Sequence, residues 1–277
     1  PAVFLDAAGL EPLNFEIIPL YFELDGSFPN HEANPLDAKN LVDLQKAVVA
    51  HGADLGLAFD GDADRCFAID ELGHAISPSA VAAIVAKREI DRVKALGETD
   101  ITVIHNALTS RSVEEVIREA GAKPYRTRVG HSLIKDAMAE TQAVFGGEHS
   151  AHYYFRDFWG ADNGMLAALH LVAEIACSEE PASKLGERFT PYFASGEINS
   201  TIEDRDSALS RVRAALAQAQ EEVFDGTTFS YSDGKIWWWA NIRPSNTEPL
   251  LRLNVESSHE ASMVEIRDKA IKAIRNL

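Results

Sequence analysis

A run of alternating acidic residues follows a short apolar stretch near residue 60. Residues 60–65 read DGDADR, so that Asp60, Asp62 and Asp64 are separated by single small residues. Three such carboxylates, with a glycine to bend the chain, can converge on one hard cation, and oxygen-only ligands favour magnesium or calcium over zinc. Like charges this close repel unless a cation neutralises them. We therefore interpret the three aspartates as metal ligands, in preference to a solvated acidic turn.

An EF-hand is the competing interpretation of the same residues. Asp60, Asp62, Asp64 and Glu71 occupy positions 1, 3, 5 and 12 of such a loop. Position 6 should be glycine but is Arg65, and the flanking residues favour strands where an EF-hand needs helices. A calcium-binding module is therefore disfavoured. Arg65 beside the aspartates points instead to a site that binds a phosphate next to its metal.

A second polar cluster occupies residues 130–154. Gly130, His131 and Ser132 begin a predicted helix, and Lys135 lies in its first turns. A helix N-terminus and a cation together can bind an anion. The structural alternative, a capping Ser132 and a solvated Lys135, has equal weight when this segment is considered alone.

The segment that follows combines several hydrogen-bonding side chains on one loop. Residues 146–152 read GGEHSAH and supply Glu148, Ser150 and His152 after a short apolar strand. A carboxylate can accept hydrogen bonds from two vicinal hydroxyls at once. The loop therefore suits a sugar.

A third cluster lies between two predicted strands, at residues 243–249, which read RPSNTEP. Arg243, Ser245, Asn246 and Thr247 place one cation, two hydroxyls and an amide on a tight loop. Arginine with hydroxyl donors matches the oxygens of a phosphate. An ordinary turn is the alternative, but a turn does not need an arginine and two hydroxyls together, so we favour a phosphate clamp.

Strand and helix signals alternate along the first two-thirds of the chain, which predicts α/β domains with parallel sheets covered by helices. The predicted strands are residues 3–5, 15–19, 55–59, 66–69, 101–105, 125–128 and 143–145. The predicted helices are residues 37–50, 112–120, 132–140 and 162–175.

The last third changes character. Strands predicted at residues 229–231, 235–241 and 250–255 lie between helices at 206–219 and 261–274. This order predicts a smaller α+β domain. We place the domains at residues 1–78, 79–190 and 191–277.

Composition limits the possible partners and the compartment. A formal net charge of −17 over 277 residues disfavours nucleic acid and anionic membranes, so a site for an anionic substrate must be a local basic exception. The longest apolar stretches are too short to span a bilayer. Two separated cysteines, Cys66 and Cys177, favour the cytoplasm over a disulfide scaffold.

Taken in order, these clusters resemble the α-D-phosphohexomutases. Residues 60–65, 147–152 and 243–248 look like the family's metal, sugar and phosphate loops, and residues 130–135 (GHSLIK) resemble a further substrate-contacting segment. The sugar loop commonly reads GEMSGH in the family, so His149 and Ala151 are departures. Its GEHSAHYY form is most similar to bacterial phosphomannomutases.

The resemblance implies an intramolecular phosphotransferase, hence an isomerase, that interconverts mannose 6-phosphate and mannose 1-phosphate. The reaction would pass through a hexose 1,6-bisphosphate and an enzyme phosphoserine. It also implies Mg²⁺ on the aspartates and catalytic roles for Arg65 and His131. Substrate contacts are implied for Glu148, Ser150, His152, Lys135, Arg243, Ser245, Asn246 and Thr247.

The resemblance also implies four domains around a cleft: three α/β domains and a C-terminal domain resembling the TATA-binding-protein fold. Residues 1–78 then correspond to an incomplete second domain. The first domain would carry the serine, and no serine of this sequence has the setting of that loop. We therefore expect an inactive fragment whose partner is the N-terminal domain of the same polypeptide. Phosphoglucomutase, phosphoglucosamine mutase and a non-catalytic sugar-phosphate binding protein are the alternatives.

Overall fold

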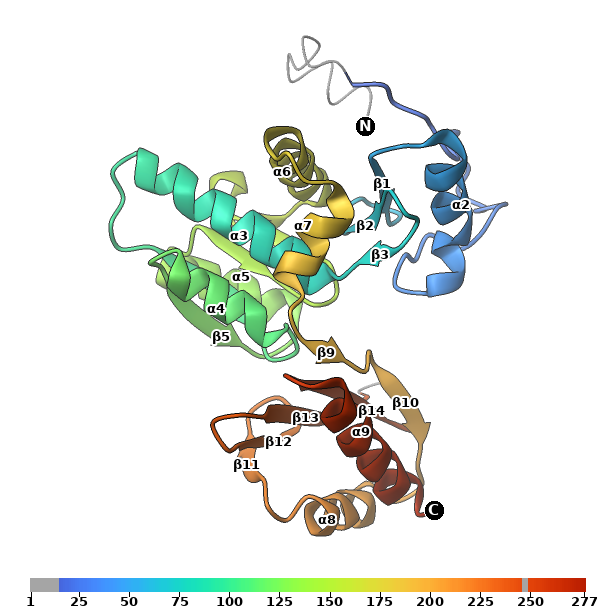
Figure 1. Cartoon of the computed structure of the whole chain (residues 1–277), viewed down its shortest axis with the longest axis vertical. Coiled ribbons are helices and arrows are strands. Elements are labelled where there is room, and N and C mark those ends of the chain that lie inside the picture. The colour runs from blue at the N-terminus through green and yellow to red at the C-terminus, as the bar shows by residue number, and fades with distance from the viewer. Residues whose placement is uncertain (1–14, 246–248) are drawn as a thin grey trace.

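The computed structural model describes residues 15–245 and 249–277 and contains three separate sheets (Figure 1). Two of the sheets lie in the upper body of the molecule as drawn, and the third forms a lobe below them. The mixed α/β architecture agrees with the predicted fold class. The predicted strand 3–5, Asn246 and Thr247 lie outside the described residues.

The first sheet is a small antiparallel one. It consists of β1 (Leu55–Phe59), β2 (Cys66–Asp70) and β3 (Ala75–Ile76), and it is preceded by η1 (Ala38–Leu41) and α2 (Val42–His51). Only residues 60–65 join β1 to β2, and a parallel pair needs a much longer crossover. The prediction of parallel pairing is therefore wrong here, whereas strands on both sides of the acidic run confirm the exclusion of an EF-hand.

The strand predicted at residues 15–19 is wrong. This segment pairs with no described strand, and Phe15, Ile17 and Ile18 are 40–42% exposed. An extended apolar run becomes a strand only where a neighbouring backbone offers hydrogen bonds.

The second sheet has the order β5-β4-β6-β7-β8 and mixes both pairings. Its centre is parallel, with β4 (Thr102–Asn106) between β5 (Lys123–Thr127) and β6 (Phe145–Gly147). The strands β7 (Tyr153–Phe155) and β8 (Ala161–Asp162) continue it antiparallel. The accompanying helices are α3 (Pro78–Ala95), α4 (Arg111–Glu119), α5 (His131–Thr141), η2 (Arg156–Phe158), α6 (Gly164–Cys177) and α7 (Ala182–Phe189).

Sequence reasoning missed α3, the longest helix between residues 15 and 245. Its start signals were present, since Ser77 accepts a hydrogen bond from the Ser79 N–H and Pro78 occupies the first turn. Residues 79–86 are all buried, so this half of the helix lacks the alternation of apolar and polar faces that reveals a surface helix.

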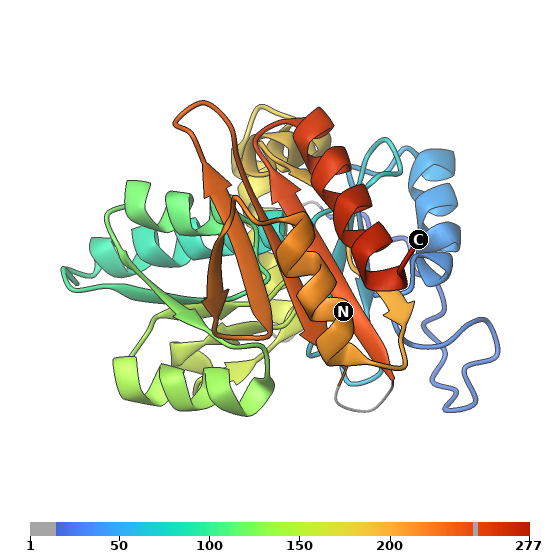
Figure 2. The same ribbon diagram turned by 90° about the horizontal axis from the view of Figure 1, so that it is seen from below.

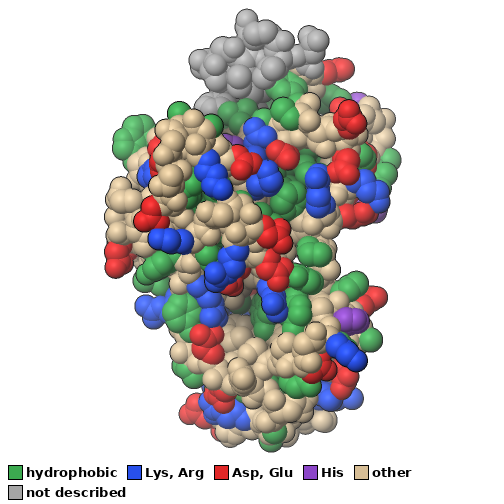
Figure 3. All heavy atoms as spheres, turned by 60° about the vertical axis from the view of Figure 1, so that its left-hand side comes forward, with side chains coloured by type: hydrophobic (Ala, Val, Ile, Leu, Met, Phe, Trp, Pro, Cys, Tyr) green, Lys and Arg blue, Asp and Glu red, His purple; other side chains and the backbone are tan. Residues whose placement is uncertain are grey.

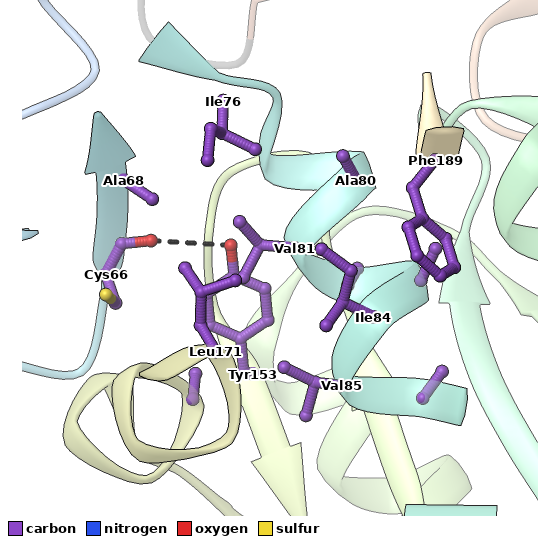
Figure 4. Packing of buried hydrophobic residues seen from close by; sticks show 14 of the residues in the cluster. Cys66, Ala68, Ile76, Ala80, Val81, Ile84, Val85, Tyr153, Leu171 and Phe189 are labelled. Atoms are coloured by element: carbon purple, nitrogen blue, oxygen red, sulfur yellow. Dashed lines mark hydrogen bonds between the residues drawn. The ribbon is translucent and has the colours of Figure 1, made fainter. Parts of the chain in front are cut away.

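The first two sheets share one hydrophobic core, which includes β2, α3, α6 and α7. Figure 4 shows its centre, where the Tyr153 ring lies among Val81, Ile84 and Leu171. The Tyr153 hydroxyl donates a hydrogen bond to the Cys66 carbonyl at 3.4 Å. Cys66 is fully buried in this core. This core holds the start of β2 firmly against β7.

The third sheet forms the C-terminal lobe, in the order β10-β14-β13-β12-β11 with β9 also paired to β14. Its strands are β9 (Phe193–Ala194), β10 (Ile198–Thr201), β11 (Gln220–Val223), β12 (Thr227–Ser232), β13 (Trp237–Pro244) and β14 (Leu250–Ser257). Figure 2 shows α8 (Arg205–Ala215) and α9 (Glu260–Arg275) side by side across one face of this sheet. The likeness to the TATA-binding-protein fold stays a prediction.

The opposite face of the third sheet meets the upper body. Trp238 points into the core of the lobe and is 4% exposed. The neighbouring residues Trp237 and Trp239 point to the other side of the sheet. There the Arg111 guanidinium lies 4.6 Å from the Trp237 ring centre, and the Trp239 indole donates a hydrogen bond to Glu256.

A space-filling view shows acidic and basic side chains interspersed over one face of the molecule (Figure 3). None of the described helices is both long and apolar enough to cross a membrane.

Candidate active site

The acidic run forms the tight connection between β1 and β2. Asp60 organises it, because its carboxylate accepts from the Arg65 N–H at 3.1 Å and its carbonyl accepts from the Ala63 N–H at 3.2 Å. Ala63 adopts the left-handed conformation at φ 59°. The turn brings one oxygen from each of Asp60, Asp62 and Asp64 within 4.8 Å of the others.

Burial and charge make this loop receptive to a cation. The Asp60 side chain is 5% exposed, and Arg65 Nε lies 2.6 Å from its Oδ2. Burial alone would raise the pKa of Asp60, but its hydrogen bonds from Arg65 and the charge of that guanidinium hold the pKa below its usual range. Burial, reinforced by the neighbouring Asp60 charge, raises the pKa of Asp64 to about 6. Since Asp64 Oδ1 is buried without a hydrogen-bond partner, the residues fit a magnesium ion well.

Two other segments hold the acidic loop in place. The Gly164 N–H at the start of α6 donates to the Ala63 carbonyl at 3.1 Å, and the Cys66 N–H donates to the Ala151 carbonyl at 3.3 Å. Arg65 and His152 form an isolated antiparallel bridge. The metal loop and the sugar loop, residues 147–152, are therefore backbone neighbours although they are far apart in the sequence.

Glu148 is the most buried polar group of the sugar loop, with 1% exposure. Its Oε1 accepts from the Asn106 amide at 3.1 Å, and its Oε2 accepts from the Tyr154 hydroxyl at 3.0 Å. Burial raises the pKa of Tyr154 further above its ordinary value, with the Glu148 charge adding to the effect. Two of the roughly four acceptor directions of a carboxylate remain for a ligand.

Ser150 and His152 form a pair on the same loop. Ser150 Oγ lies 3.0 Å from His152 Nδ1, and His152 Nε2 lies 3.6 Å from Asp64 Oδ1. Burial lowers the pKa of His152 to about 4, assisted by electrostatic repulsion from the neighbouring His131 and Arg65 side chains. His149 turns elsewhere, because its Nδ1 meets Ser79 Oγ at 3.0 Å. It lines a cavity of about 40 Å³ between the upper body and the C-terminal lobe.

His131 and Lys135 on α5 share one acidic partner, which sequence reasoning did not identify. Asp162 Oδ1 lies 3.0 Å from Lys135 Nζ, and Asp162 Oδ2 lies 3.0 Å from His131 Nδ1. The charge of Lys135 is thus neutralised by a carboxylate. Gly130 is the N-cap and no side chain caps the helix, so the alternative role of Ser132 as the cap is wrong.

The phosphate loop lies at the end of β13, and the structure describes part of it. Arg243 Nη2 lies 4.0 Å from Glu197 Oε2, while Arg252 Nη1 lies 3.4 Å from Glu197 Oε1. Arg252 also donates to Ser245 Oγ at 3.5 Å, and both arginine Nε groups are buried without hydrogen-bond partners. Two guanidinium groups therefore lie close together here, with one carboxylate between them. Arg252 was missed because it faces the loop from β14.

Comparison with known proteins places this geometry in a family. The chain matches the phosphoglucomutase/phosphomannomutase family in three successive domain models: the alpha/beta/alpha domain II over residues 4–73, the alpha/beta/alpha domain III over 77–192 and the C-terminal domain over 197–273. The class is therefore that of the α-D-phosphohexomutases, and the chain belongs to the phosphoglucomutase/phosphomannomutase family, as its motifs predicted.

Individual members of the family show how similar the chain is to known proteins. The chain is 39% identical to a phosphomannomutase of Salmonella typhimurium and 38% identical to one of Escherichia coli, each over 94% of its length. It spans 56% of each relative, or about half the length of the curated relatives it matches. A crystal structure of a phosphoglucomutase/phosphomannomutase family protein from Burkholderia thailandensis superposes with a TM-score of 0.82 at 28% identity. That match covers 99% of this chain and 58% of the other.

Proposed function

We propose that these residues belong to a phosphomannomutase, which interconverts mannose 6-phosphate and mannose 1-phosphate in the cytoplasm. The observation that carries the proposal is the contact between the metal loop and the sugar loop, where Arg65 and His152 pair and Asp64 faces the His152 imidazole. A cation site beside hydroxyl-binding groups suits phosphoryl transfer to a sugar. The names of the relatives support mannose.

In this proposal the acidic loop provides the charge stabilisation. Asp60, Asp62 and Asp64 hold Mg²⁺, which supplies positive charge to the moving phosphoryl group when it is bound. Arg65 is oriented by Asp60 at 2.6 Å and adds charge beside it. The phosphoserine that exchanges its phosphoryl group with the sugar is supplied by the N-terminal domain of the same polypeptide, outside the residues present here.

Binding and orientation of the sugar phosphate fall to the other two loops. Glu148, Ser150 and His152 accept the sugar hydroxyls, and because Glu148 is 1% exposed, the loop must open for contact. Arg243, Ser245, Asn246 and Thr247 clamp the phosphate that does not react, with Arg252 as a further donor. Lys135 contributes a positive charge for substrate binding at the edge of the site, where it is held by its ion pair with Asp162.

His131 has a supporting role in proton transfer. The Tyr154 hydroxyl lies 3.1 Å from its Nδ1 and itself donates to Glu148, so the imidazole is fixed by a chain of hydrogen bonds. As the phosphoryl group passes from phosphoserine to a sugar hydroxyl, the O–P bond to serine breaks and the bond to the sugar oxygen forms. The proton of the sugar hydroxyl is taken up with the help of His131 and returned to the serine oxygen, which leaves as a hydroxyl. A second transfer from the hexose 1,6-bisphosphate back to serine leaves the other isomer.

The test joins these residues to their upstream coding segment and compares mutase rates on mannose 1-phosphate and glucose 1-phosphate, with Mg²⁺ and a hexose 1,6-bisphosphate. Preference for the mannose epimer supports the proposal. Preference for the glucose epimer makes the protein a phosphoglucomutase. If neither turns over while sugar phosphate still binds, the proposal fails and a non-catalytic binding protein remains.

A further inference from the structure

Four side chains that can bind a metal converge beside the triple-aspartate loop. One of them, Asp64, belongs to that loop, and the other three come from elsewhere in the chain. One ligand atom from each of Asp64, His131, His152 and Asp162 lies within 4.8 Å of the others. The four residues come from the β1–β2 connection, the start of α5, the sugar loop and β8. The two imidazole ring centres are 4.0 Å apart, edge to face. Folding therefore creates a cluster with two nitrogen and two oxygen ligands that no local motif contains.

Two buried carboxylate oxygens without hydrogen bonds are an independent observation in favour of a bound cation. The Asp162 side chain is 7% exposed, and its Oδ2 is buried without a hydrogen-bond partner although His131 Nδ1 lies 3.0 Å away. Lys135 reaches only the other oxygen. Asp64 Oδ1 likewise has no hydrogen-bond partner, with His152 Nε2 at 3.6 Å and Arg65 Nε at 3.9 Å. Because a buried polar atom without a hydrogen bond is destabilising, a cation between these two oxygens would remove two unfavourable terms.

Hydrogen bonds behind the histidines orient them as ligands. His152 Nδ1 lies 3.0 Å from Ser150 Oγ and 3.5 Å from Glu148 Oε2, which leaves Nε2 directed at Asp64. Metal-binding histidines usually have such a partner on the ring nitrogen that does not bind the ion, and His152 has this arrangement. In His131 the Tyr154 hydroxyl and Asp162 Oδ2 both lie close to Nδ1, and the same Tyr154 hydroxyl donates to Glu148. Glu148 thus supports both imidazoles at once.

The donor types indicate which ion this cluster prefers. Two imidazoles and two carboxylates suit Zn²⁺ or Co²⁺, whereas the three aspartates of the acidic loop suit Mg²⁺. Zinc bonds of about 2.0–2.2 Å place tetrahedral ligand atoms about 3.4 Å apart. The present spread of up to 4.8 Å must therefore contract by small side-chain movements when the ion binds.

We propose that Asp64, His131, His152 and Asp162 form a second metal site, selective for zinc-like transition ions, which shares Asp64 with the magnesium site. Because one carboxylate serves both sites and two dications so close repel, binding of the two ions is antagonistic. The transition ion therefore withdraws Asp64 from Mg²⁺. This inference does not depend on the sugar specificity or on turnover.

The experiment titrates Co²⁺ into the metal-free 277-residue chain and records the intense visible absorption of four-coordinate Co²⁺. We expect saturable bands at one equivalent that Zn²⁺ abolishes. Asp162→Asn and, as a second variant, His152→Gln should each weaken Co²⁺ binding at least 10-fold, with folding checked by circular dichroism. Asp60→Asn and the matched control His170→Gln keep all four ligands and should retain the bands.

A magnesium arm tests the shared ligand. Mg²⁺ should raise the Co²⁺ concentration needed for half-saturation in the parent chain but have no such effect in Asp60→Asn, whose magnesium site is impaired. Ser150→Ala, which removes the partner of His152 Nδ1, should weaken Co²⁺ binding about 10-fold. A weak six-coordinate spectrum, or bands that survive in both Asp162→Asn and His152→Gln, would overturn the proposal. So would Co²⁺ binding that ignores Mg²⁺ in the parent chain.

Discussion

Gly164 packs directly against the backbone of Arg65. A Cβ at position 164 would lie 2.5 Å from the Arg65 carbonyl oxygen and 2.9 Å from that of Ala63. The Gly164 N–H donates to the Ala63 carbonyl at 3.1 Å, so the close approach also carries a hydrogen bond. The first residue of α6 is thus in direct backbone contact with the metal loop and helps to fix its conformation.

We expect Gly164→Ala to lower the free energy of unfolding by about 1–3 kcal/mol, because backbone atoms must move to admit the methyl group. It should also weaken Mg²⁺ binding, since the displaced atoms belong to the metal loop. Urea unfolding and magnesium titration measure the two effects. The control is Gly186→Ala in α7, where the nearest atoms are Ile76 side-chain carbons at 3.5 Å. That variant should gain about 0.4–1 kcal/mol, and equal losses in both variants would refute the packing argument.

Local spacing was enough to predict that Asp60, Asp62 and Asp64 converge, because they need only one turn of chain to do so. Asp162 was not predictable, because its relation to His131 depends on β8 lying beside the start of α5. Arg252 likewise reaches Ser245 only across the β13–β14 pairing. Local patterns therefore predict polar groups that converge within one loop, whereas groups brought together by tertiary contacts require the fold.

The same contrast holds for the elements of the fold. The helices predicted at residues 112–120 and 261–274 are confirmed as α4 and α9 with shifted ends. The helix α3 escaped detection because residues 79–86 are buried all round. The segment 15–19 has a strand's composition but no described strand to pair with. The composition of an apolar segment does not reveal which other segments it packs against in the fold.

Magnesium should stabilise the folded chain through the acidic loop. At a concentration ten times its dissociation constant, an ion that binds only the folded state adds about 1.4 kcal/mol to the free energy of unfolding. We expect this gain in the parent chain and not in Asp62→Asn, an exposed position where the substitution itself should be well tolerated. Thermal unfolding with and without Mg²⁺ measures it. A full gain in Asp62→Asn would remove that residue from the ligand set.

His105 should make the stability of the chain depend on pH. Its side chain is buried, Nδ1 lies 2.9 Å from Thr109 Oγ1, and burial lowers its pKa to about 4 from an ordinary 6.5. Between these values the unfolded state binds more protons, so the stabilising contribution is complete above pH 6.5 and is lost as the pH falls towards 4. The maximum loss is about 3 kcal/mol.

Urea unfolding of the parent chain and of His105→Gln at several pH values isolates this contribution from those of the other histidines. The difference between the two proteins should change with pH between 6.5 and 4 and be constant above that window. A constant difference throughout would show that folding does not lower the pKa of His105, and would contradict the prediction.

Glu256 connects the C-terminal lobe to the upper body. From β14 its Oε2 accepts from the Arg111 N–H at 3.0 Å, at the N-terminus of α4, and from the Trp239 indole at 2.9 Å. Glu256→Ala leaves both donors without a partner and should cost about 1–3 kcal/mol. Glu256→Gln keeps an acceptor and should lose only the charge–dipole part, about 0.3–1 kcal/mol. Chemical denaturation distinguishes the two, and equal losses would show that the charge matters more than the hydrogen bonds.

Glu197 should act as a competitor for the proposed phosphate clamp. Its carboxylate lies 4.0 Å from Arg243 Nη2 and 3.4 Å from Arg252 Nη1, so an incoming phosphate must displace it or share its partners. A partly exposed ion pair contributes up to about 1 kcal/mol, so Glu197→Gln should tighten mannose 6-phosphate binding about three- to fivefold. Calorimetric titration at low salt measures the change in affinity.

Two further variants serve as controls. Glu265→Gln on α9 removes an equal charge at a distance from the loop and should leave the affinity unchanged. Arg243→Lys should weaken binding, because it removes the paired donors of the guanidinium group. Unchanged affinity in Glu197→Gln together with full binding in Arg243→Lys would place the phosphate elsewhere on the chain.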